Sequence, residues 1–300
     1  MRIGVIGGSG FIGSHTIPSL QENNHDVVVI DIEQPYNKGV RYIRADITKY
    51  EEALRAVSSL DAVYMLAACK YVNVCFNDPV YAVDTNIQGL TNVLQACRCA
   101  NVGRVIFASS VWVYNGCIQS TVNEETDIVS DHTRSLYGYT KVVGESLVKN
   151  FHHSYGLDYT ILRYGVAYGP RSSDETVISK FINRAINDEP LVICGTGDVC
   201  RSFLYVTDHA SANLLALSDS AKNQTFNIEG TEQITVNKVA NTVKKLTGKA
   251  ITIQHTEPRT GEFNGVDICI NKAKNVLGWS PEISFDEGMK LHYEWMTRER

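Results

Sequence analysis

Two side chains with acid–base chemistry stand four residues apart in the segment Tyr137-Gly138-Tyr139-Thr140-Lys141. On a helix this spacing places Tyr137 and Lys141 on one face, where their side chains can interact. An ammonium group beside a phenol favours the phenolate, so we expect Lys141 to lower the pKa of Tyr137 from about 10 toward the range of a general base. Tyr and Lys also occur four apart by chance on exposed helices, so this pair needs support from elsewhere in the chain.

A serine hydroxyl supplies part of that support. The segment 104–109 is typical of a buried strand, and Ser109 and Ser110 stand at its carboxyl end. Ligands of open α/β sheets bind beyond the carboxyl ends of the strands, so Ser110 can hold a substrate oxygen and share a proton with Tyr137. The alternative is a serine that only satisfies nearby backbone groups.

A second chemical feature is the glycine pattern near the start of the chain. Gly7, Gly10 and Gly13 follow the apolar run 3–6, a spacing typical of a strand, a tight turn and a helix start. The first glycine permits the turn, the second lets the backbone approach a pyrophosphate, and the third lets the helix pack close to the strand. Because a helix N-terminus also attracts phosphate, we expect a dinucleotide here.

The next apolar run, 27–30, ends in a carboxylate. Asp31 lies near the distance from the glycines at which an acidic residue binds the adenosine ribose. A carboxylate there repels a 2′-phosphate, so the sequence favours NAD over NADP. The alternative is an aspartate that merely starts a loop.

The elements that must position these residues alternate between strand and helix, which is typical of a parallel sheet with helices on both faces. We therefore predict the α/β class, with a Rossmann-type doubly wound parallel sheet and a smaller C-terminal α/β lobe. The dinucleotide-binding domain is expected over residues 1–170, with a segment at about 195–230 returning to it. Residues 171–300 are expected to form mainly the substrate-binding lobe. Long helices are predicted over 78–100 and 135–155, and the polar stretch 111–134 is predicted to be a functional loop.

Composition excludes several classes of protein. A net charge of −5 with no run of Lys or Arg argues against a nucleic-acid partner. No apolar run approaches the length of a membrane span, and the first strand begins too early to leave room for a signal peptide, so we expect a cytoplasmic protein with no membrane partner. The eight cysteines are expected to be free thiols, and no metal site is expected, because Cys97 and Cys99 lack further ligands nearby.

These motifs together resemble the extended short-chain dehydrogenase/reductase family, in its nucleotide-sugar branch of epimerases and dehydratases that includes UDP-glucose 4-epimerases. The resemblance covers nearly the whole chain. The other segments that carry it are Asp46-Ile47, Leu66-Ala67-Ala68, Asn86-Ile87-x-Gly89, Leu162-Arg163, Tyr168-Gly169-Pro170, Gly195-x-Gly197, Arg201-x-Phe203 and Leu277-Gly278-Trp279-x-Pro281.

The resemblance implies roles for these residues. Tyr137 is the acid/base, Lys141 its modulator and an anchor for the cofactor ribose, and Ser110 the partner of the substrate hydroxyl. The implied cofactor is NAD, and the implied contacts to it are Gly7, Gly10, Phe11, Ile12, Gly13, Asp31, Asp46, Ile47, Leu66, Ala67, Ala68, Tyr137 and Lys141.

The resemblance also implies a nucleotide-diphosphate sugar as substrate. Arg201 and Arg259 look like the arginines that such enzymes place on the diphosphate, because a guanidinium meets phosphate oxygens with two hydrogen bonds. The alternative is a pair of surface arginines, while Arg163 is expected to be a structural ion-pair residue at a strand end. A homodimer through the helices at 78–100 and 135–155 is a further expectation from the family.

The activity we expect is NAD-dependent epimerisation of the sugar at C4, by transient oxidation to a keto-sugar and return of the hydride. The alternatives are a 4,6-dehydratase, a nucleotide-sugar decarboxylase or a ketosugar reductase. A dinucleotide-sensing regulatory protein is the alternative outside enzymes, and the presence of Tyr137 and Lys141 argues against it. Val111 and Trp112 stand where dehydratases of the family carry an Asp-Glu pair, which favours the epimerase.

The sequence departs from the family pattern at two positions. Val166 stands where an asparagine is usual, and Ser202 where an aspartate is usual. Valine cannot donate a hydrogen bond, so a customary polar contact to the substrate is missing. The departures leave open which sugar the protein uses.

Overall fold

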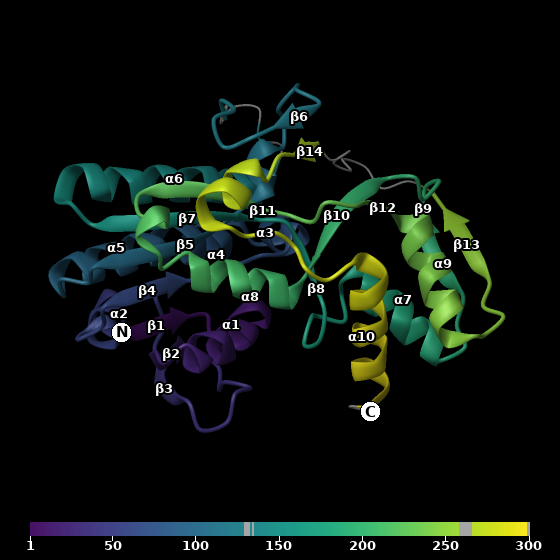
Figure 1. Ribbon diagram of the computed structural model, residues 1–300, viewed down its shortest axis with the longest axis horizontal. Helices are drawn as coiled ribbons and strands as arrows, with labels where there is room; N and C mark the ends of the chain where they lie inside the picture. Colours follow the sequence, from purple (N-terminus) through teal and green to yellow (C-terminus); the bar gives the residue numbers. More distant parts are fainter. Residues whose placement is uncertain (129–132, 134, 258–265, 299–300) are drawn as a thin grey trace. The chain divides into compact units, whose positions relative to one another are not determined.

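The computed structural model describes residues 1–128, 133, 135–257 and 266–298 (Figure 1). The chain forms two compact units, each assembled from segments that are separated in sequence. The first unit comprises Met1–Tyr164, His209–Ile228 and Asp267–Ser280, and the second comprises Gly165–Asp208, Glu229–Val266 and Pro281–Arg300. The segment that returns to the first unit, His209–Ile228, is shorter than the expected one at about 195–230, and a second returning segment, Asp267–Ser280, was not expected.

A parallel sheet of seven strands forms the centre of the first unit. Its order is β11-β7-β5-β4-β1-β2-β3, and every neighbouring pair runs parallel. The strands are β1 (Arg2–Ile6), β2 (Asp26–Asp31), β3 (Arg41–Arg44), β4 (Ala62–Met65), β5 (Arg104–Ser110), β7 (Asp158–Tyr164) and β11 (Gln224–Ile228). The strand order reverses between β1 and β4, which makes their carboxyl ends the expected ligand-binding edge. The predicted α/β class with a Rossmann-type doubly wound sheet is confirmed.

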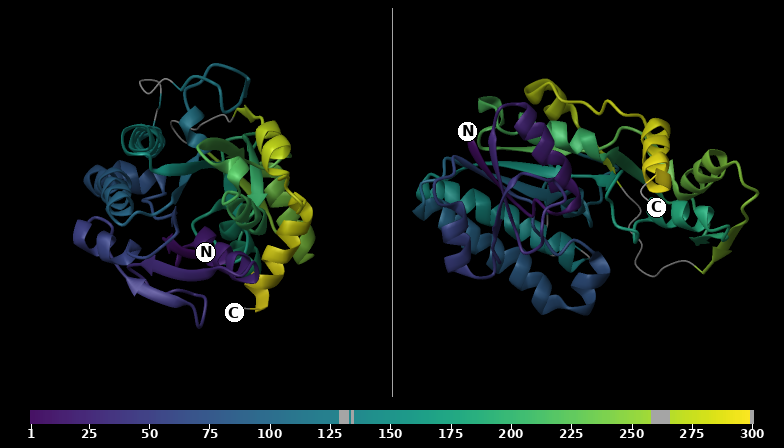
Figure 2. Two further views of the ribbon diagram at one scale, coloured as in Figure 1. Left: turned by 60° about the vertical axis from the view of Figure 1, so that its left-hand side comes forward. Right: turned by 90° about the horizontal axis from the view of Figure 1, so that it is seen from below.

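Helices cover both faces of this sheet, as Figure 2 shows. They include α1 (Phe11–Glu22), α2 (Tyr50–Val57), α5 (Gly89–Cys99), α6 (Leu136–Tyr155) and, from His209 onward, α8 (Val206–Leu215). On one face, Leu90 and Leu94 of α5 and Val148 of α6 share a buried cluster with Ile6 and Phe107 of the sheet. Because both faces are covered, the central strands are apolar without alternation, and all four residues of β4 are buried.

The helix predicted over 78–100 is observed as three consecutive segments. They are α4 (Pro79–Val83), the π-helical η1 (Asp84–Gln88) and α5. Asp78 starts this run, because its side chain accepts a hydrogen bond from the N–H of Tyr81 at 3.0 Å. A short helix before it, α3 (Val72–Asn77), was not expected, since six residues are too few to show a helical period.

The polar stretch after β5 is largely irregular, as predicted, over its described residues. It contains the 3₁₀ turn η2 (Val111–Tyr114) and the short strand β6 (Thr121–Val122), which pairs with β14 (Asp267–Ile268). Two more short turns of the first unit are η4 (Asp219–Ala221) and η5 (Ala273–Leu277).

The second unit has its own small core. Its strands and helices are β8 (Val166–Tyr168), α7 (Val177–Ile186), β9 (Leu191–Cys194), β10 (Cys200–Tyr205), β12 (Gln233–Thr235), α9 (Val236–Thr247), β13 (Ile253–Thr256) and α10 (Phe285–Arg298). The ring of Tyr168 packs against those of Phe203 and Phe285, with centroids 6.1 and 5.8 Å apart. Within the described part of the chain, no helix has both the length and the apolar character of a membrane span.

Candidate active site

Tyr137 and Lys141 lie on the first two turns of α6. Ser135 caps this helix, because its hydroxyl oxygen accepts a hydrogen bond from the N–H of Gly138 at 3.1 Å. The Nζ atom of Lys141 lies 5.8 Å from the centre of the Tyr137 ring. The two side chains therefore share one face of the helix, as their spacing predicts.

The carboxyl end of β5 meets this face. The side chains of Ser110 and Tyr137 are hydrogen-bonded, and the Nζ of Lys141 donates a hydrogen bond to the carbonyl oxygen of Ala108 at 2.7 Å. The Ser110 hydroxyl oxygen also accepts the N–H of Trp112 at 3.2 Å, so it caps η2 as well. The serine, tyrosine and lysine singled out in the sequence are thus brought together at the end of a central strand.

Burial decides the pKa values of this group. Desolvation raises the pKa of Tyr137 to about 12, against the hydrogen bond with Ser110, which lowers it. Desolvation lowers the pKa of Lys141 to about 8, while Cys75 and Glu145 act in the opposite direction. The expectation that Lys141 brings the pKa of Tyr137 below 10 is wrong for this structure, because loss of water around the phenol outweighs the hydrogen bond with Ser110.

The glycine turn between β1 and α1 has the shape that a dinucleotide requires. Gly7 has a φ of +81°, and a Cβ atom there would lie 2.5 Å from the backbone nitrogen of Ala67. A Cβ on Gly13 would lie 2.5 Å from the carbonyl oxygen of Gly7, so only glycine lets α1 begin this close to the turn. Gly10 is the N-cap of α1 and no side chain caps the helix there, while Phe11 and Ile12 form its first turn. These backbone features fit a pyrophosphate at the helix start.

Asp31 lies beside the glycine turn. Its carboxylate accepts hydrogen bonds from the N–H groups of Ser9 and Glu33, at 3.0 and 3.1 Å. The side chain is only partly buried, at the carboxyl end of β2. A carboxylate at this position can still accept hydrogen bonds from ribose hydroxyls, because each oxygen has two acceptor sites.

The other residues expected to contact the cofactor follow the strands next to β1. Leu66 and Ala67 continue beyond β4, and their N–H groups both donate to the carbonyl oxygen of Ile6, at 2.9 and 3.1 Å. Asp46 accepts hydrogen bonds from the N–H and hydroxyl of Thr48, at 3.0 and 2.7 Å. Desolvation alone would raise the pKa of Asp46, but these hydrogen bonds and Lys49 lower it overall.

Ile47 and Ala68 complete this edge of the sheet. Ile47 is buried, and its side chain occupies the space that a Cβ on Gly89 of α5 would need. Ala68 is partly exposed and follows Ala67.

The two arginines expected to bind a diphosphate differ in what the structure describes. Arg201 lies on β10 in the second unit, is partly buried, and donates a hydrogen bond to the carbonyl oxygen of Cys200 at 2.7 Å. Arg259 lies outside the described residues, so its role stays a prediction from the sequence.

Sequence reasoning missed a thiol pair beside the tyrosine. Cys69 and Cys75 are buried with sulfurs 3.4 Å apart, and Tyr137 packs against their cluster. Burial raises the pKa of Cys75 to about 12. Asn86 of η1 ties this region to α6, because its amide donates to the carbonyl oxygen of Cys69 and to the hydroxyl of Thr140, both at 3.0 Å. The π-helical turn that carries Asn86 leaves no signal in the apolar pattern of the sequence.

A buried carboxyl group in the second unit was also missed. Glu229 is 3% exposed, contacts Gly165, and accepts a hydrogen bond from the N–H of Gly230 at 3.1 Å and another from the backbone of Val166. Desolvation raises its pKa to about 8, against those two hydrogen bonds. A charged residue type at a buried position has no sequence signal, because its burial depends on the strands around it.

The structure also bears on disulfides and metal binding. All eight cysteines are free. Among the described residues, no group of three or more His, Cys, Asp or Glu side chains could hold a metal ion.

Comparisons with known proteins identify the family. Residues 3–228 match the model of the NAD dependent epimerase/dehydratase family. A putative UDP-glucose 4-epimerase of Methanocaldococcus jannaschii is 35% identical over 303 residues, which cover 97% of each chain. The solved structure of a UDP-glucose 4-epimerase from Thermotoga maritima with UDP-glucose is 32% identical, has a TM-score of 0.94, and matches 100% of this chain and 99% of its own.

A second solved structure adds the cofactor to the comparison. It is a UDP-glucuronic acid 4-epimerase from Bacillus cereus in complex with UDP-glucuronic acid and NAD, 29% identical with a TM-score of 0.92 and complete coverage of both chains. The family match spans most of the chain, and relatives at this level of identity cover nearly all of it. The chain is therefore a member of the NAD dependent epimerase/dehydratase family, within the extended short-chain dehydrogenases/reductases.

Proposed function

We propose that this protein is an NAD-dependent epimerase that inverts C4 of a UDP-sugar. The proposal is supported by the group formed by Ser110, Tyr137 and Lys141, and by relatives of which several are UDP-sugar 4-epimerases. When bound, NAD would supply the hydride acceptor. The glycine turn and Asp31 would hold the cofactor, and Lys141 would anchor its ribose.

The chain's own residues account for the proton transfers. Tyr137 takes the proton of the C4 hydroxyl as the C4 hydride leaves, and returns it when the hydride comes back to the other face of the keto-sugar. Ser110 holds the same oxygen through its hydroxyl. Lys141 keeps a positive charge beside the phenol, which favours the phenolate during the transfer.

The single observation that favours epimerisation over elimination is the chemistry of the residues that follow Ser110. Val111 is buried and Trp112 is partly buried, and neither side chain can exchange a proton at neutral pH. A 4,6-dehydratase needs one group to remove the C5 proton and another to protonate the leaving oxygen. An indole wall instead leaves room for the keto-sugar to turn without offering it an acid.

Three other residues could replace the Asp-Glu pair that dehydratases carry after the serine, but their side chains make contacts elsewhere in the first unit. Glu124 accepts a hydrogen bond from the N–H of Asn227 at 2.7 Å, and Glu125 is exposed at 3.9 Å from Lys272. The ammonium of Lys70 lies over the ring of Tyr71, 5.3 Å from its centre. These contacts support the epimerase over the dehydratase and the decarboxylase, both of which need a further acid or base.

The test is to incubate the protein with UDP-glucose or UDP-glucuronic acid and follow the product by mass spectrometry and NMR. We expect a stereoisomer of unchanged mass that retains its C4 hydrogen when the reaction runs in deuterated water. Loss of one water or of carbon dioxide would contradict the proposal. An unreactive protein that nevertheless binds NAD would favour the dinucleotide sensor.

Arg201 is proposed to bind the diphosphate of the substrate, together with Arg259. Arg201→Ala should weaken UDP-sugar binding by about 1–3 kcal/mol, the scale of a lost hydrogen bond to a charged group, and leave NAD binding unchanged. Equal loss of affinity for NAD and UDP-sugar would contradict this assignment.

A homodimer through α4, α5 and α6 is the proposed assembly. The support is a set of exposed apolar side chains on α3 and α4, at the residue before α3 and on α6: Tyr71, Val74, Phe76, Val80, Tyr81, Val83 and Tyr139. Phe76 is 82% exposed and Val80 is 73% exposed, and exposed apolar patches of this kind mark interaction surfaces. Light scattering should give a dimer for the wild type and a monomer for Val80→Glu.

The eight free cysteines support a cytoplasmic location, because a reducing compartment keeps thiols unpaired.

A further inference from the structure

Three successive turns of α6 each hold one of three consecutive residues at the end of β5. The contacting pairs are Tyr137 with Ser110, Lys141 with Ala108, and Glu145 with Ser109. The helical residues follow at intervals of four, so they lie on one face. The proposed mechanism uses the first two pairs and leaves the third, in which the Ser109 hydroxyl donates to a carboxylate oxygen of Glu145 at 2.6 Å, without a role.

The third pair is anchored by a buried ion pair. The guanidinium of Arg163 on β7 donates from Nε to Oε1 of Glu145 at 2.9 Å and from Nη2 to Oε2 at 2.8 Å. Glu145 is 4% exposed and Arg163 is 2% exposed. Burial alone would lower the pKa of Arg163, but hydrogen bonding and attraction to Glu145 raise it overall, so the pair is charged. Two parallel hydrogen bonds fix the carboxylate in direction as well as in distance.

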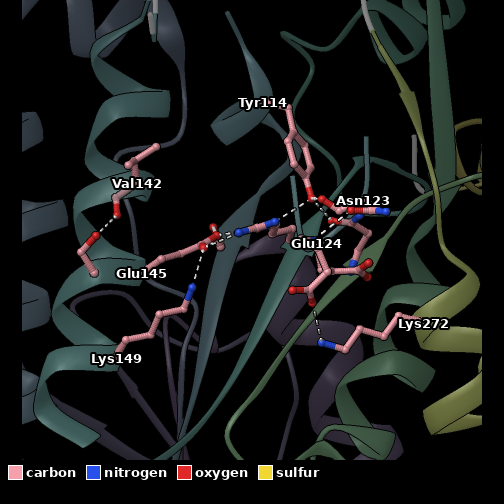
Figure 3. Close-up of polar contacts among 12 residues, drawn as sticks. Tyr114, Asn123, Glu124, Val142, Glu145, Lys149 and Lys272 are labelled. Carbon is pink, nitrogen blue, oxygen red and sulfur yellow. Dashed lines mark hydrogen bonds and ion pairs between the residues drawn. The ribbon is translucent and has the colours of Figure 1, made fainter. Parts of the chain in front are cut away.

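The same arginine also fixes the chain beyond Ser110. Its Nη1 atom donates to the hydroxyl oxygen of Tyr114 at 2.6 Å, and the carbonyl oxygen of Asn123 and the side chain of Asn227 also lie within hydrogen-bond distance of that hydroxyl. In Figure 3 the contacts run without a break from Lys149 and Glu145 on α6 to Tyr114 and Asn123. Ser110 therefore lies between two residues, Ser109 and Tyr114, that this network holds.

The packing of α6 on β5 is tight at the same turn. Gly144 precedes Glu145, and a Cβ atom on it would lie 2.6 Å from Cζ of Phe107. The helix can therefore approach the strand this closely only with glycine there, which places the carboxylate of Glu145 within reach of Ser109.

We propose that Glu145, held by Arg163, is a positioning residue that sets the register of Ser110 against Tyr137 and keeps the Lys141 ammonium at Ala108. This inference rests on the proposed function, since it assigns a role in the same reaction. Misplacing catalytic groups by about 1 Å costs about a hundredfold in rate, so a residue that fixes this register affects turnover without touching the substrate.

The charge of Glu145 affects the pKa of Lys141, and this effect separates a positioning role from simple stabilisation of the fold. The titratable groups that face Lys141 are Cys75 of α3 and Tyr137 and Glu145 of α6, while β5 offers the Ala108 carbonyl and the Phe107 ring. Desolvation lowers the pKa of Lys141 to about 8, and the charge of Glu145 opposes that effect. Neutralising Glu145 therefore makes Lys141 lose its proton at a lower pH.

The test compares Glu145→Gln with the wild type as full-length, NAD-loaded protein on the UDP-sugar that the wild type epimerises. We expect kcat to fall about tenfold to a hundredfold with KM nearly unchanged, and the alkaline limb of the kcat/KM profile to move to lower pH. Lys149→Gln is the matched control, because Lys149 lies 3.9 Å from Glu145 but is 47% exposed. It should leave both quantities unchanged.

Two further variants keep the inference testable if Glu145→Gln does not fold. Glu145→Asp keeps the charge with a shorter side chain, so its alkaline limb should coincide with that of the wild type while kcat stays reduced. Ser109→Ala removes one hydrogen bond without leaving a buried guanidinium unpaired, and should lower kcat several-fold at unchanged KM. Wild-type kcat and pH profile in every variant that folds would overturn the inference, whatever the variants do to the melting temperature.

The pH dependence of NAD affinity, measured on the same proteins, does not need turnover. Suppose that the wild type epimerises no UDP-sugar while the alkaline fall in NAD affinity still moves to lower pH in Glu145→Gln. In that case the proposed function fails and the positioning role stands. If the wild type is active and neither limb moves nor kcat falls, the positioning role fails alone.

Discussion

The glycine turn lies at the carboxyl end of one strand of the sheet. The α6–β5 face, where Tyr137, Lys141 and Glu145 of α6 meet the end of β5, lies at the carboxyl end of another. The two sites are built in different ways. The turn is local: Gly7 follows β1, Gly13 lies in α1 and Asp31 ends β2, and most of the groups they present are backbone amides. The α6–β5 face joins side chains from Ser109 to Asn227, nearly all of them buried. Local backbone geometry and one carboxylate form the first site, whereas the second depends on long-range packing and on desolvation of charged groups.

This comparison predicts that the α6–β5 face is most sensitive to the loss of single atoms. Tyr137→Phe removes the proposed proton acceptor but keeps the ring, so kcat should fall about a hundredfold or more, with NAD affinity nearly unchanged. Steady-state kinetics and calorimetric NAD titration would measure both. Tyr139→Phe is the matched control, because Tyr139 lies two residues further along α6 and is exposed. Equal activity of the two variants would remove Tyr137 from the mechanism.

The glycine turn should instead be sensitive to added atoms. Gly13→Ala puts a Cβ about 2.5 Å from the Gly7 carbonyl oxygen, so the turn or the start of α1 must shift. Overpacking of this kind costs about 1–3 kcal/mol, and a shift of that size in the cradle should weaken NAD binding about tenfold to a hundredfold. Calorimetric titration with NAD measures the change. Unaltered NAD affinity in a folded variant would show that the close approach of helix and turn is not needed for binding.

Desolvation predicts a pH dependence for the α6–β5 face that the turn should not share. The Lys141 ammonium is present below its pKa of about 8 and is lost as the pH rises above it. If Lys141 must be charged and Tyr137 is a phenolate throughout this range in the NAD-loaded protein, kcat/KM should be level below that pH and fall about tenfold per pH unit above it. A profile that rises through this range would contradict a requirement for the ammonium.

The smallest expected effect concerns cofactor choice at the turn. Asp31→Ser removes the carboxylate that repels a 2′-phosphate, so the preference for NAD over NADP should narrow by roughly tenfold, the scale of a lost hydrogen bond to a charged group. Asp26→Ser is the control, since Asp26 is exposed at the other end of β2 and the change in net charge is the same. If the wild type binds both cofactors equally, Asp31 does not select NAD.

The sequence alone predicted the fold class, the parallel sheet and the grouping of Ser110 with Tyr137 and Lys141. These features depend on patterns that are short in sequence: uninterrupted apolar runs, glycine spacing, and a four-residue interval on a helix. Glu145 continues the interval of Tyr137 and Lys141, so its place on the same face was also available from the sequence.

Only the tertiary structure decided what those residues meet. The pKa of Tyr137 is raised rather than lowered, because the ring packs against buried residues of α3, α4 and the segment after β4, which exclude water. The partner of Glu145 is Arg163, eighteen residues further along the chain on a different strand, and no local pattern records that pairing. Spacing along one element determines which side chains share a face, but burial and long-range partners determine their charge and position, and these depend on elements that meet only when the whole sheet has formed.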